Sequence, residues 1–215
     1  MSPEALLQGI ILLPVLASLV IAAIGERSPN GREAVTLVAG LLVLMMVLAL
    51  YGNLRADPSG VIEVVWLQWL PGLSIAFRLD ALGMLFALVA GVLWPVTSLY
   101  AIGYLRAHGE DNQTRFYACF AIAIGAAMGV AVAANLLTLF VFYELLTLST
   151  YPLVTHAGTD AARRGGRTYL LLLLGTSTVF LLLALIGTWA LAGTLTFTPG
   201  GVFPAETSNL VVGVL

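Results

Sequence analysis

The apolar block FYACFAIAIGAAMGVAVAANLLTLFVFYELLTLSTYPLV, residues 116–154, decides the fold of this chain. Among its 39 residues, Asn135 and Glu144 are the interruptions. A single helix of that length would extend about 58 Å, nearly twice the hydrocarbon core of a bilayer. The chain must therefore turn back inside the block. Ala134 and Asn135 form the expected corner, because asparagine tolerates tight turns, and Glu144 then lies at mid-depth of the second helix.

The composition indicates that the rest of the chain also lies in a lipid bilayer. Of the 215 residues, 60% are hydrophobic and 9% are charged, and the mean hydropathy is +1.02. A soluble domain carries about 25% charged residues, so this chain cannot cover a globule with polar surface. We therefore predict an all-α membrane protein whose solvent is the lipid bilayer. The sequence contains no basic block for nucleic acid.

Six segments are long and apolar enough to span a bilayer, which takes about 20 residues per helix. They lie near residues 5–25, 34–52, 81–105, 116–133, 136–154 and 168–193. We expect one transmembrane domain over residues 1–215, a polytopic bundle of about six helices. The apolar run VVGVL at 211–215 is interpreted as the beginning of a further helix, so the chain is expected to be the N-terminal part of a longer protein.

The arginines predict the orientation of this bundle. The chain has nine arginines and no lysine. Arg55 and Arg78 fall in loops on one side, whereas the other seven fall on the opposite side: Arg27, Arg32, Arg106, Arg115, Arg163, Arg164 and Arg167. Loops rich in positive charge stay in the cytoplasm. We therefore expect an inner-membrane protein with its N-terminus on the outer, periplasmic face.

A small β-hairpin is expected on the outer face, between the second and third helices. LSIAFRLD at 73–80 alternates apolar and polar residues, and VIEVVWLQWL at 61–70 is rich in β-branched and aromatic side chains. Pro71 and Gly72 between them suit a turn. An interfacial loop anchored by Trp66 and Trp69 fits the same residues about equally well.

Glu144 is the candidate functional residue, because it is the one acidic residue inside an expected span. A charged side chain at this depth costs a few kcal/mol. Such a group usually faces a protein or water interior and belongs to an ion or proton path. A carboxyl group whose proton affinity changes when a partner charge moves meets the physical requirement of a proton relay.

Polar side chains continue from Glu144 toward the cytoplasmic end of its helix. Positions i+3, i+7 and i+11 are Thr147, Tyr151 and Thr155, which lie on one stripe. Hydroxyl groups can pass a proton or hold ordered water. His156, which titrates near neutral pH, follows at the boundary. The predicted relay is Glu144, Thr147, Tyr151 and His156; the alternative is a packed neutral carboxyl with hydroxyls that hold helices together.

No motif for a nucleotide, metal or haem is present. The sequence lacks a G-x-x-x-x-G-K-S/T loop, and His108 and His156 both lie outside the expected spans. We therefore expect no catalytic site, no metal and no cofactor. The driving energy would come from a gradient or from other subunits.

Five stretches, spread over residues 77–177, about half of the chain, carry a resemblance: FRLDALGMLFAL (77–88), YAIGYL (100–105), NQTRFYACFAIAIGAAMG (112–129), NLLTLFVFYELLTLSTYPLVTH (135–156) and GRTYLLLLLGTS (166–177). On these residues the sequence resembles the antiporter-like membrane subunits shared by respiratory complex I and the Mrp-type multisubunit cation/proton antiporters. Within that family it looks most similar to the D-type Mrp subunits.

The resemblance implies a longer protein of a dozen or more helices, built on two inverted repeats of five helices. Glu144 coincides with the family's fifth-helix glutamate, which pairs with a lysine on the seventh helix and controls proton movement in a half-channel. These 215 residues contain no lysine, so that partner is absent from them. The implied function is a proton-conducting antiporter subunit, with other membrane subunits, protons and, as a further candidate, sodium as partners.

Three alternatives fit the same residues. One is a proton-pumping subunit of an NADH-quinone oxidoreductase or membrane-bound hydrogenase, in which redox chemistry elsewhere drives the relay. The second is a structural membrane scaffold with a packed carboxyl. The third is an unrelated solute transporter with a substrate pocket in broken helices, at which only Pro14, Pro95 and Pro152 hint.

Overall fold

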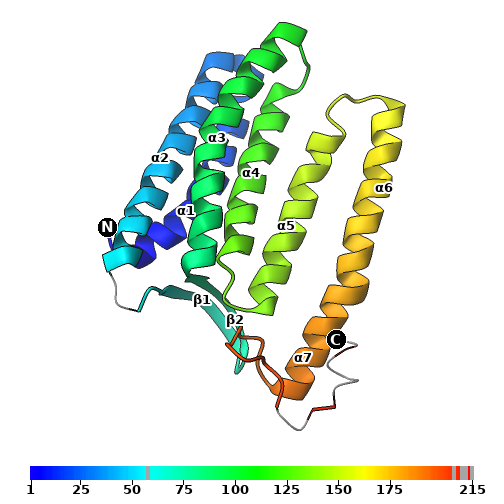
Figure 1. Ribbon diagram of the computed structural model, residues 1–215. Coiled ribbons are helices and arrows are strands. Elements are labelled where there is room, and N and C mark those ends of the chain that lie inside the picture. Colours follow the sequence, from blue (N-terminus) through cyan, green and yellow to red (C-terminus); the bar gives the residue numbers. More distant parts are fainter. Residues whose placement is uncertain (57–58, 205–206, 209–212, 214–215) are drawn as a thin grey trace.

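The computed structural model describes residues 1–56, 59–204, 207–208 and 213. Antiparallel helices stand side by side, and a β-hairpin crosses one end of them (Figure 1). Six of the described helical segments are long and apolar enough to cross a membrane, which confirms the prediction of an all-α polytopic protein. The run VVGVL lies, apart from Gly213, outside the described residues.

The first four helices form the main bundle: α1 (Pro3–Ile24), α2 (Pro29–Ala56), α3 (Ala81–His108) and α4 (Gln113–Ala131), with the short turn η1 (Gly25–Arg27) between α1 and α2. Their shared core buries apolar side chains from all four helices, including Ile10, Val43, Trp94 and Tyr117. Gly125 lets α4 approach α1 closely, because a Cβ there would lie 2.9 Å from the carbonyl oxygen of Ile11.

The two remaining spans stand beside this bundle. α5 (Leu136–Val154) packs on α4, and a continuous helical segment packs on α5: α6 (Asp160–Thr176), the π-helix η2 (Ser177–Leu181) and α7 (Leu182–Ala192). This last span begins at Asp160, earlier than the expected residue 168. The reason is that the Thr159 side chain accepts a hydrogen bond from Ala162 N and caps a polar first turn, which hydropathy cannot detect.

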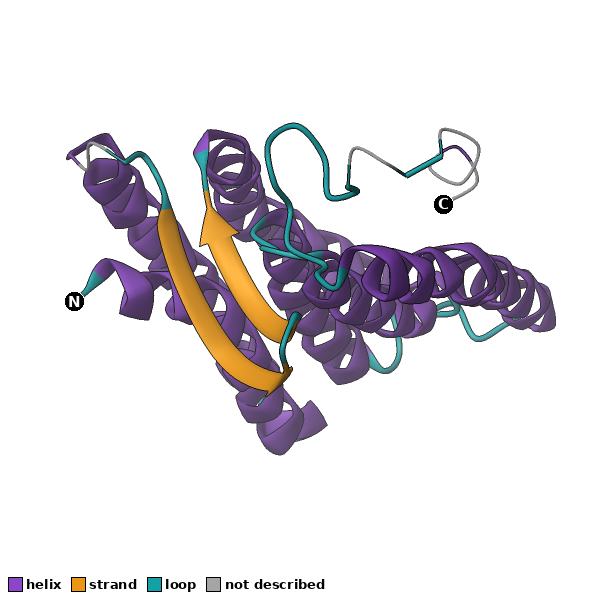
Figure 2. Cartoon of the chain, turned by 90° about the horizontal axis from the view of Figure 1, so that it is seen from below, coloured by secondary structure: helices purple, strands orange, loops and turns teal. Residues whose placement is uncertain are grey.

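The two strands confirm the hairpin prediction over the interfacial loop. β1 (Ile62–Leu70) pairs antiparallel with β2 (Leu73–Leu79), and Gly72 adopts a φ of +80° in the turn between them. The hairpin crosses the helix ends, with β1 against α1 and β2 against α3 and α5 (Figure 2). Trp66 packs edge-on against Phe77, with ring centroids 4.5 Å apart, which anchors the hairpin to the core.

Asn135 forms the corner between α4 and α5, at the predicted position. Its side-chain oxygen accepts a hydrogen bond from Thr138 N at 2.8 Å, and its side-chain nitrogen donates to Ser74 O at 2.9 Å. Thr138 Oγ1 in turn accepts a hydrogen bond from Ala76 N at 2.9 Å. The corner therefore caps α5 and fixes the start of that helix to β2.

Candidate functional site

Glu144 lies midway along α5 with its carboxyl group buried. Both side-chain oxygens are shielded from solvent, and neither has a hydrogen-bond partner within the described part of the chain. Buried polar side chains in folded proteins nearly always have such a partner. The unpaired carboxyl therefore marks a place where water, a proton or a group from outside these residues must act.

The stripe that contains Glu144 faces α6. A Cβ on Gly166 of α6 would overlap the methyl group of Thr155 and would lie 3.2 Å from a ring carbon of Tyr151. Because positions i, i+7 and i+11 share one helix face, Glu144 lies on the same side of α5. Thr147, which is only 2% exposed, belongs to this face too. The candidate site is thus the seam between α5 and α6.

The contact between α5 and α6 determines which residues of the neighbouring helical segment lie at the same depth as Glu144. The hydroxyls of Thr150 and Tyr169 are 3.0 Å apart across the seam. Both helices rise by the same amount per residue and run antiparallel, so Glu144 lies level with residues 175–177. The π-helix η2 begins there with Ser177, which is buried. Short π-helical turns occur frequently at functional sites.

The hydroxyl groups of the stripe are oriented by their own helix. Thr147 Oγ1 donates to Tyr143 O and Thr155 Oγ1 donates to Tyr151 O, each at 3.0 Å. Their lone pairs remain available to accept a further hydrogen bond. Among the described residues, no direct hydrogen bond joins Glu144 to Thr147 or Tyr151. The structure brings these three together on one face, and a proton path along them would need water.

His156 lies apart from that face. Its ring packs against Phe116 of α4, with centroids 5.4 Å apart, and both ring nitrogens are buried without a partner among the described residues. Burial lowers the pKa of His156 below its ordinary value of 6.5, and the positive charge of Arg115 adds to this, while Glu110 opposes it. His156 is therefore a neutral imidazole at pH 7, on the α4 side of the end of α5.

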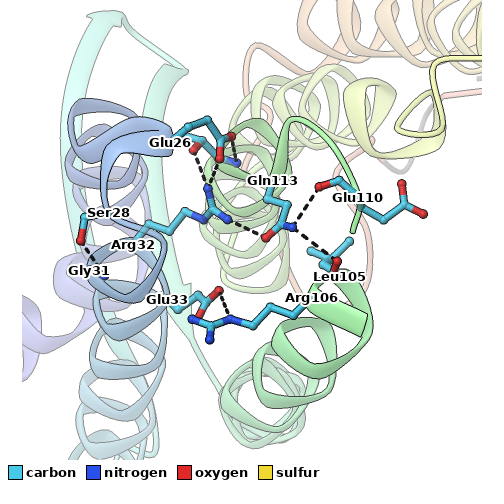
Figure 3. A network of polar contacts seen from close by, with 10 residues as sticks. Glu26, Ser28, Gly31, Arg32, Glu33, Leu105, Arg106, Glu110 and Gln113 are labelled. Carbon is cyan, nitrogen blue, oxygen red and sulfur yellow. Dashed lines mark hydrogen bonds and ion pairs between the residues drawn. The ribbon is translucent and has the colours of Figure 1, made fainter. Parts of the chain in front are cut away.

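A second polar cluster, which sequence reasoning missed, joins the helices at the end opposite the hairpin (Figure 3). Arg32 is only 2% exposed. Its guanidinium forms an ion pair with Glu26 and donates to Gln113 Oε1 at 2.5 Å and to Thr114 Oγ1 at 3.1 Å. The three partners come from η1 and α4, so Arg32 ties α2 to both.

Glu33 completes this cluster from the next position of α2. Arg106 of α3 donates to both of its carboxylate oxygens, at 3.0 and 2.5 Å, in a bidentate pair. From the sequence, Arg32 and Arg106 were expected to lie in loops. The structure corrects this, because α2 begins at Pro29 and α3 continues to His108. The sequence did offer one signal for this cluster, namely oppositely charged residues at the ends of two expected helices.

The described residues contain no cluster of three or more His, Cys, Asp or Glu side chains placed to hold a metal ion. The chemistry that this arrangement offers is proton binding at Glu144, with hydroxyl groups on the same face of α5 and the imidazole of His156 beyond the end of that helix.

Known proteins match both the sequence and the fold. A family model described as "NADH:quinone oxidoreductase/Mrp antiporter, TM" matches residues 133–204, which hold α5 to α7. The A/B subunit of a probable K(+)/H(+) antiporter from Rhizobium meliloti (strain 1021) is 31% identical over 185 residues, covering 85% of this chain and 18% of the relative. The A1 subunit of a Na(+)/H(+) antiporter from Staphylococcus aureus is 27% identical over 156 residues, covering 70% and 19%.

The chain belongs to the antiporter-like membrane subunits of the complex I and Mrp family. Two solved structures share the fold of this antiporter-like chain. An archaeal membrane-bound sulfane sulfur reductase matches with a TM-score of 0.77 and 20% identity, covering 91% of this chain and 39% of the other. The Mrp complex from Dietzia sp. matches with a TM-score of 0.66 and 22% identity, covering 91% and 36%.

The antiporter-like chain spans less than a fifth of the length of these two curated relatives. Both relatives carry the names of A-type subunits, so the specific likeness to the D-type subunits stays a prediction.

Proposed function

We propose that the chain is part of a proton-conducting membrane subunit of a multisubunit monovalent cation/proton antiporter, in which Glu144 binds and releases the proton. The observation that carries the proposal is the buried carboxyl of Glu144, which has no partner among the described residues. A carboxylate without a counter-charge is costly inside a membrane, so it takes up a proton. It releases that proton when water or a cation approaches.

The relay would continue along the α6-facing side of α5. Thr147 and Tyr151 offer hydroxyl groups that can hold water between Glu144 and the end opposite the hairpin. His156 would be the last member, since a neutral imidazole can accept a proton at the boundary. Its ring lies on the α4 side, so the step from Tyr151 to His156 would pass around the end of α5.

We propose an inner-membrane location with the N-terminus on the outer face. The seven arginines expected on the cytoplasmic side lie in η1 or in the parts of α2, α3, α4 and α6 toward the end opposite the hairpin, whereas Arg55 lies in the last turn of α2 and Arg78 in β2. Figure 1 shows these two ends of the molecule. This asymmetry supports the end opposite the hairpin as cytoplasmic. The lipid bilayer and other membrane subunits are the proposed partners, and sodium is the further candidate cation.

A second candidate is a proton-pumping subunit of an NADH-quinone oxidoreductase. The family model that matches α5 to α7 names that enzyme together with the Mrp antiporter. Glu144 would have the same role, and the energy would come from redox chemistry in other subunits. Proton flux driven by a cation gradient favours the antiporter, whereas flux that requires a reductant favours the redox pump.

The test is Glu144→Gln in the full-length protein within its complex, with proton flux measured by a pH-sensitive dye in inside-out vesicles. Glutamine preserves the size of the side chain and cannot carry the proton. We expect proton-coupled transport to fall by about 100-fold or more, the scale of a lost proton-transfer group. Glu63→Gln, at an exposed carboxylate of the hairpin, is the matched control and should retain transport. Normal transport in Glu144→Gln would instead support a scaffold with a packed carboxyl.

A further inference from the structure

A pocket lies between the ends of α3 and α5, beside the loop that joins α3 to α4. Its volume is about 420 Å³, which falls in the usual range for ligand sites, about 300 to 1,000 Å³. Both helices pack on α4. Phe116 of α4, together with Leu153 and Val154 of α5, contributes to the wall.

The pocket combines a membrane-embedded part with a polar mouth. Thr97 and Ala101 of α3 line the inner part, about two to three helical turns from the end of α3. Glu110, in the loop after α3, and His156, after α5, line the mouth. A site that is apolar at depth and carries charge at the boundary matches an amphipathic ligand.

Two groups at the mouth have no partner of their own. The carboxylate of Glu110 makes no hydrogen bond or ion pair within the described part of the chain, and Figure 3 shows it directed away from Gln113. The ring nitrogens of His156 are buried and equally unpaired among these residues. Buried polar atoms nearly always find a partner, so the buried imidazole of His156 calls for a group that accepts a hydrogen bond from it. The partly exposed carboxylate of Glu110 lines the same mouth and is available to accept a hydrogen bond from a positively charged group.

Aromatic side chains open the pocket toward the lipid. Tyr100 is 68% exposed and Tyr104 is 45% exposed, and their rings stack with centroids 6.0 Å apart. Tyrosines gather at the headgroup level of membranes, where the ring is in lipid and the hydroxyl is hydrated. Their ring faces also attract ammonium groups. A lipid at headgroup level can therefore contact the pocket on the side lined by these two tyrosines of α3.

We propose that this pocket binds the headgroup of a zwitterionic phospholipid that carries a primary amine, of the phosphatidylethanolamine type. The ammonium group pairs with Glu110, next to the tyrosine rings. The phosphate accepts a hydrogen bond from His156, which lines the mouth. An acyl chain runs along Leu153 and Val154. The pocket shares His156 with the proposed relay, but lipid binding there does not depend on proton transport by Glu144.

The experiment uses the full-length protein in its complex, reconstituted with equal amounts of dioleoyl phosphatidylethanolamine, phosphatidylcholine and phosphatidylglycerol. Native mass spectrometry counts the lipids that the complex retains, and a photoactivatable phosphatidylethanolamine locates the site by cross-linking. We expect retention of phosphatidylethanolamine over the other two lipids by about tenfold, as for one charge-assisted hydrogen bond. Cross-links are expected at Tyr100, Tyr104 and Leu153.

Glu110→Gln tests the ammonium contact, and Asp111→Asn removes the same charge one residue away, outside the pocket lining. Glu110→Gln should lower the retention of phosphatidylethanolamine by about tenfold, and Asp111→Asn should leave it unchanged. Equal retention of the three lipids would overturn the proposal. So would equal effects of the two variants, or cross-links from Tyr100 to another protein of the complex in place of lipid.

Discussion

Arg32 and Glu144 both have buried side-chain polar groups, but they differ in whether those groups have hydrogen-bond partners. The guanidinium of Arg32 has hydrogen-bond partners from η1 and α4, whereas the carboxyl of Glu144 has none among the described residues. A buried charge with several hydrogen bonds can hold elements together, and removing one partner is costly. A buried acid without partners instead gains from binding a proton. Burial therefore supports helix assembly at Arg32 and, in the proposed function, proton binding at Glu144.

The first prediction concerns Arg32. Replacing it with alanine leaves Gln113 without its strongest contact and unties α2 from η1 and α4. We expect the free energy of unfolding to fall by about 3 kcal/mol, measured by thermal or chaotrope-induced unfolding in detergent micelles. Arg27→Ala, at an exposed arginine nearby, is the control and should change stability by less than about 0.5 kcal/mol. Equal effects of the two substitutions would contradict the assigned role.

The second prediction concerns the pH dependence of stability through His156. Its pKa in the folded state lies below 6.5 because of burial, so the unfolded chain takes up a proton first as the pH falls. The neutral His156 side chain therefore makes its full contribution to the stability of the folded state above about pH 6.5. That contribution is lost as the pH falls below this value. His156→Gln should reduce the decline in melting temperature between about pH 7 and pH 5. His108→Gln controls for the loss of an imidazole, and an unchanged decline in His156→Gln would contradict the prediction.

At this scale the sequence predicted Glu144 and missed the Arg32 cluster, for one physical reason. A lone acid inside an apolar run stands out whatever the packing. Charges at the ends of a span, such as Glu33 and Arg106, resemble ordinary boundary residues, and their burial depends on where each helix begins and on which neighbour covers it. Their burial therefore depends on partners that are far apart in the sequence, and no local sequence pattern predicts those partners.

Among the elements, α5 and α6 form the seam that positions the candidate site. Gly166 allows the close approach, because a Cβ there would overlap the methyl group of Thr155. The neighbouring Gly165 has open space, with no atom within 4 Å of where its Cβ would lie. The two glycines therefore offer a matched pair for testing whether helix contact, rather than helix propensity, matters.

The third prediction is that alanine has opposite effects at these two positions. Gly165→Ala should stabilise the protein by up to about 1 kcal/mol through helix propensity. Gly166→Ala should destabilise it by about 1 to 3 kcal/mol, because α6 must move away from α5. Thermal unfolding in micelles measures both. Stabilisation by both substitutions would show that the seam is loose and would remove the support for Glu144 facing α6.

The elements themselves were largely predictable from local patterns. Apolar length indicated six helices, and alternation with a Pro71–Gly72 turn indicated the hairpin. What failed was the beginning of α6, because its first turn, Asp160–Arg163, is polar and depends on the Thr159 cap. The π-helix η2 has no distinct signal in hydropathy, since its residues, STVFL, continue the apolar span.

For the molecule as a whole, the side chains separate into a packed bundle and an open flank. α1 to α4 share one core, while α6, η2 and α7 bury few of their residues and leave large apolar side chains such as Leu171, Phe180 and Leu183 exposed. Sequence patterns predict that such helices are in a membrane, but not whether lipid or protein covers them. In the proposed antiporter, Glu144 lies next to this flank, where groups from outside the described residues can reach it.

The central claim is that Glu144 changes its protonation state as the protein works. Infrared difference spectroscopy of the full-length complex, recorded before and after addition of the transported cation, measures this directly through the carboxyl stretching band. The account predicts that addition of the cation changes a buried carboxyl band and that this change is absent in Glu144→Gln. A difference spectrum that is identical in Glu144→Gln and the parent protein would contradict it.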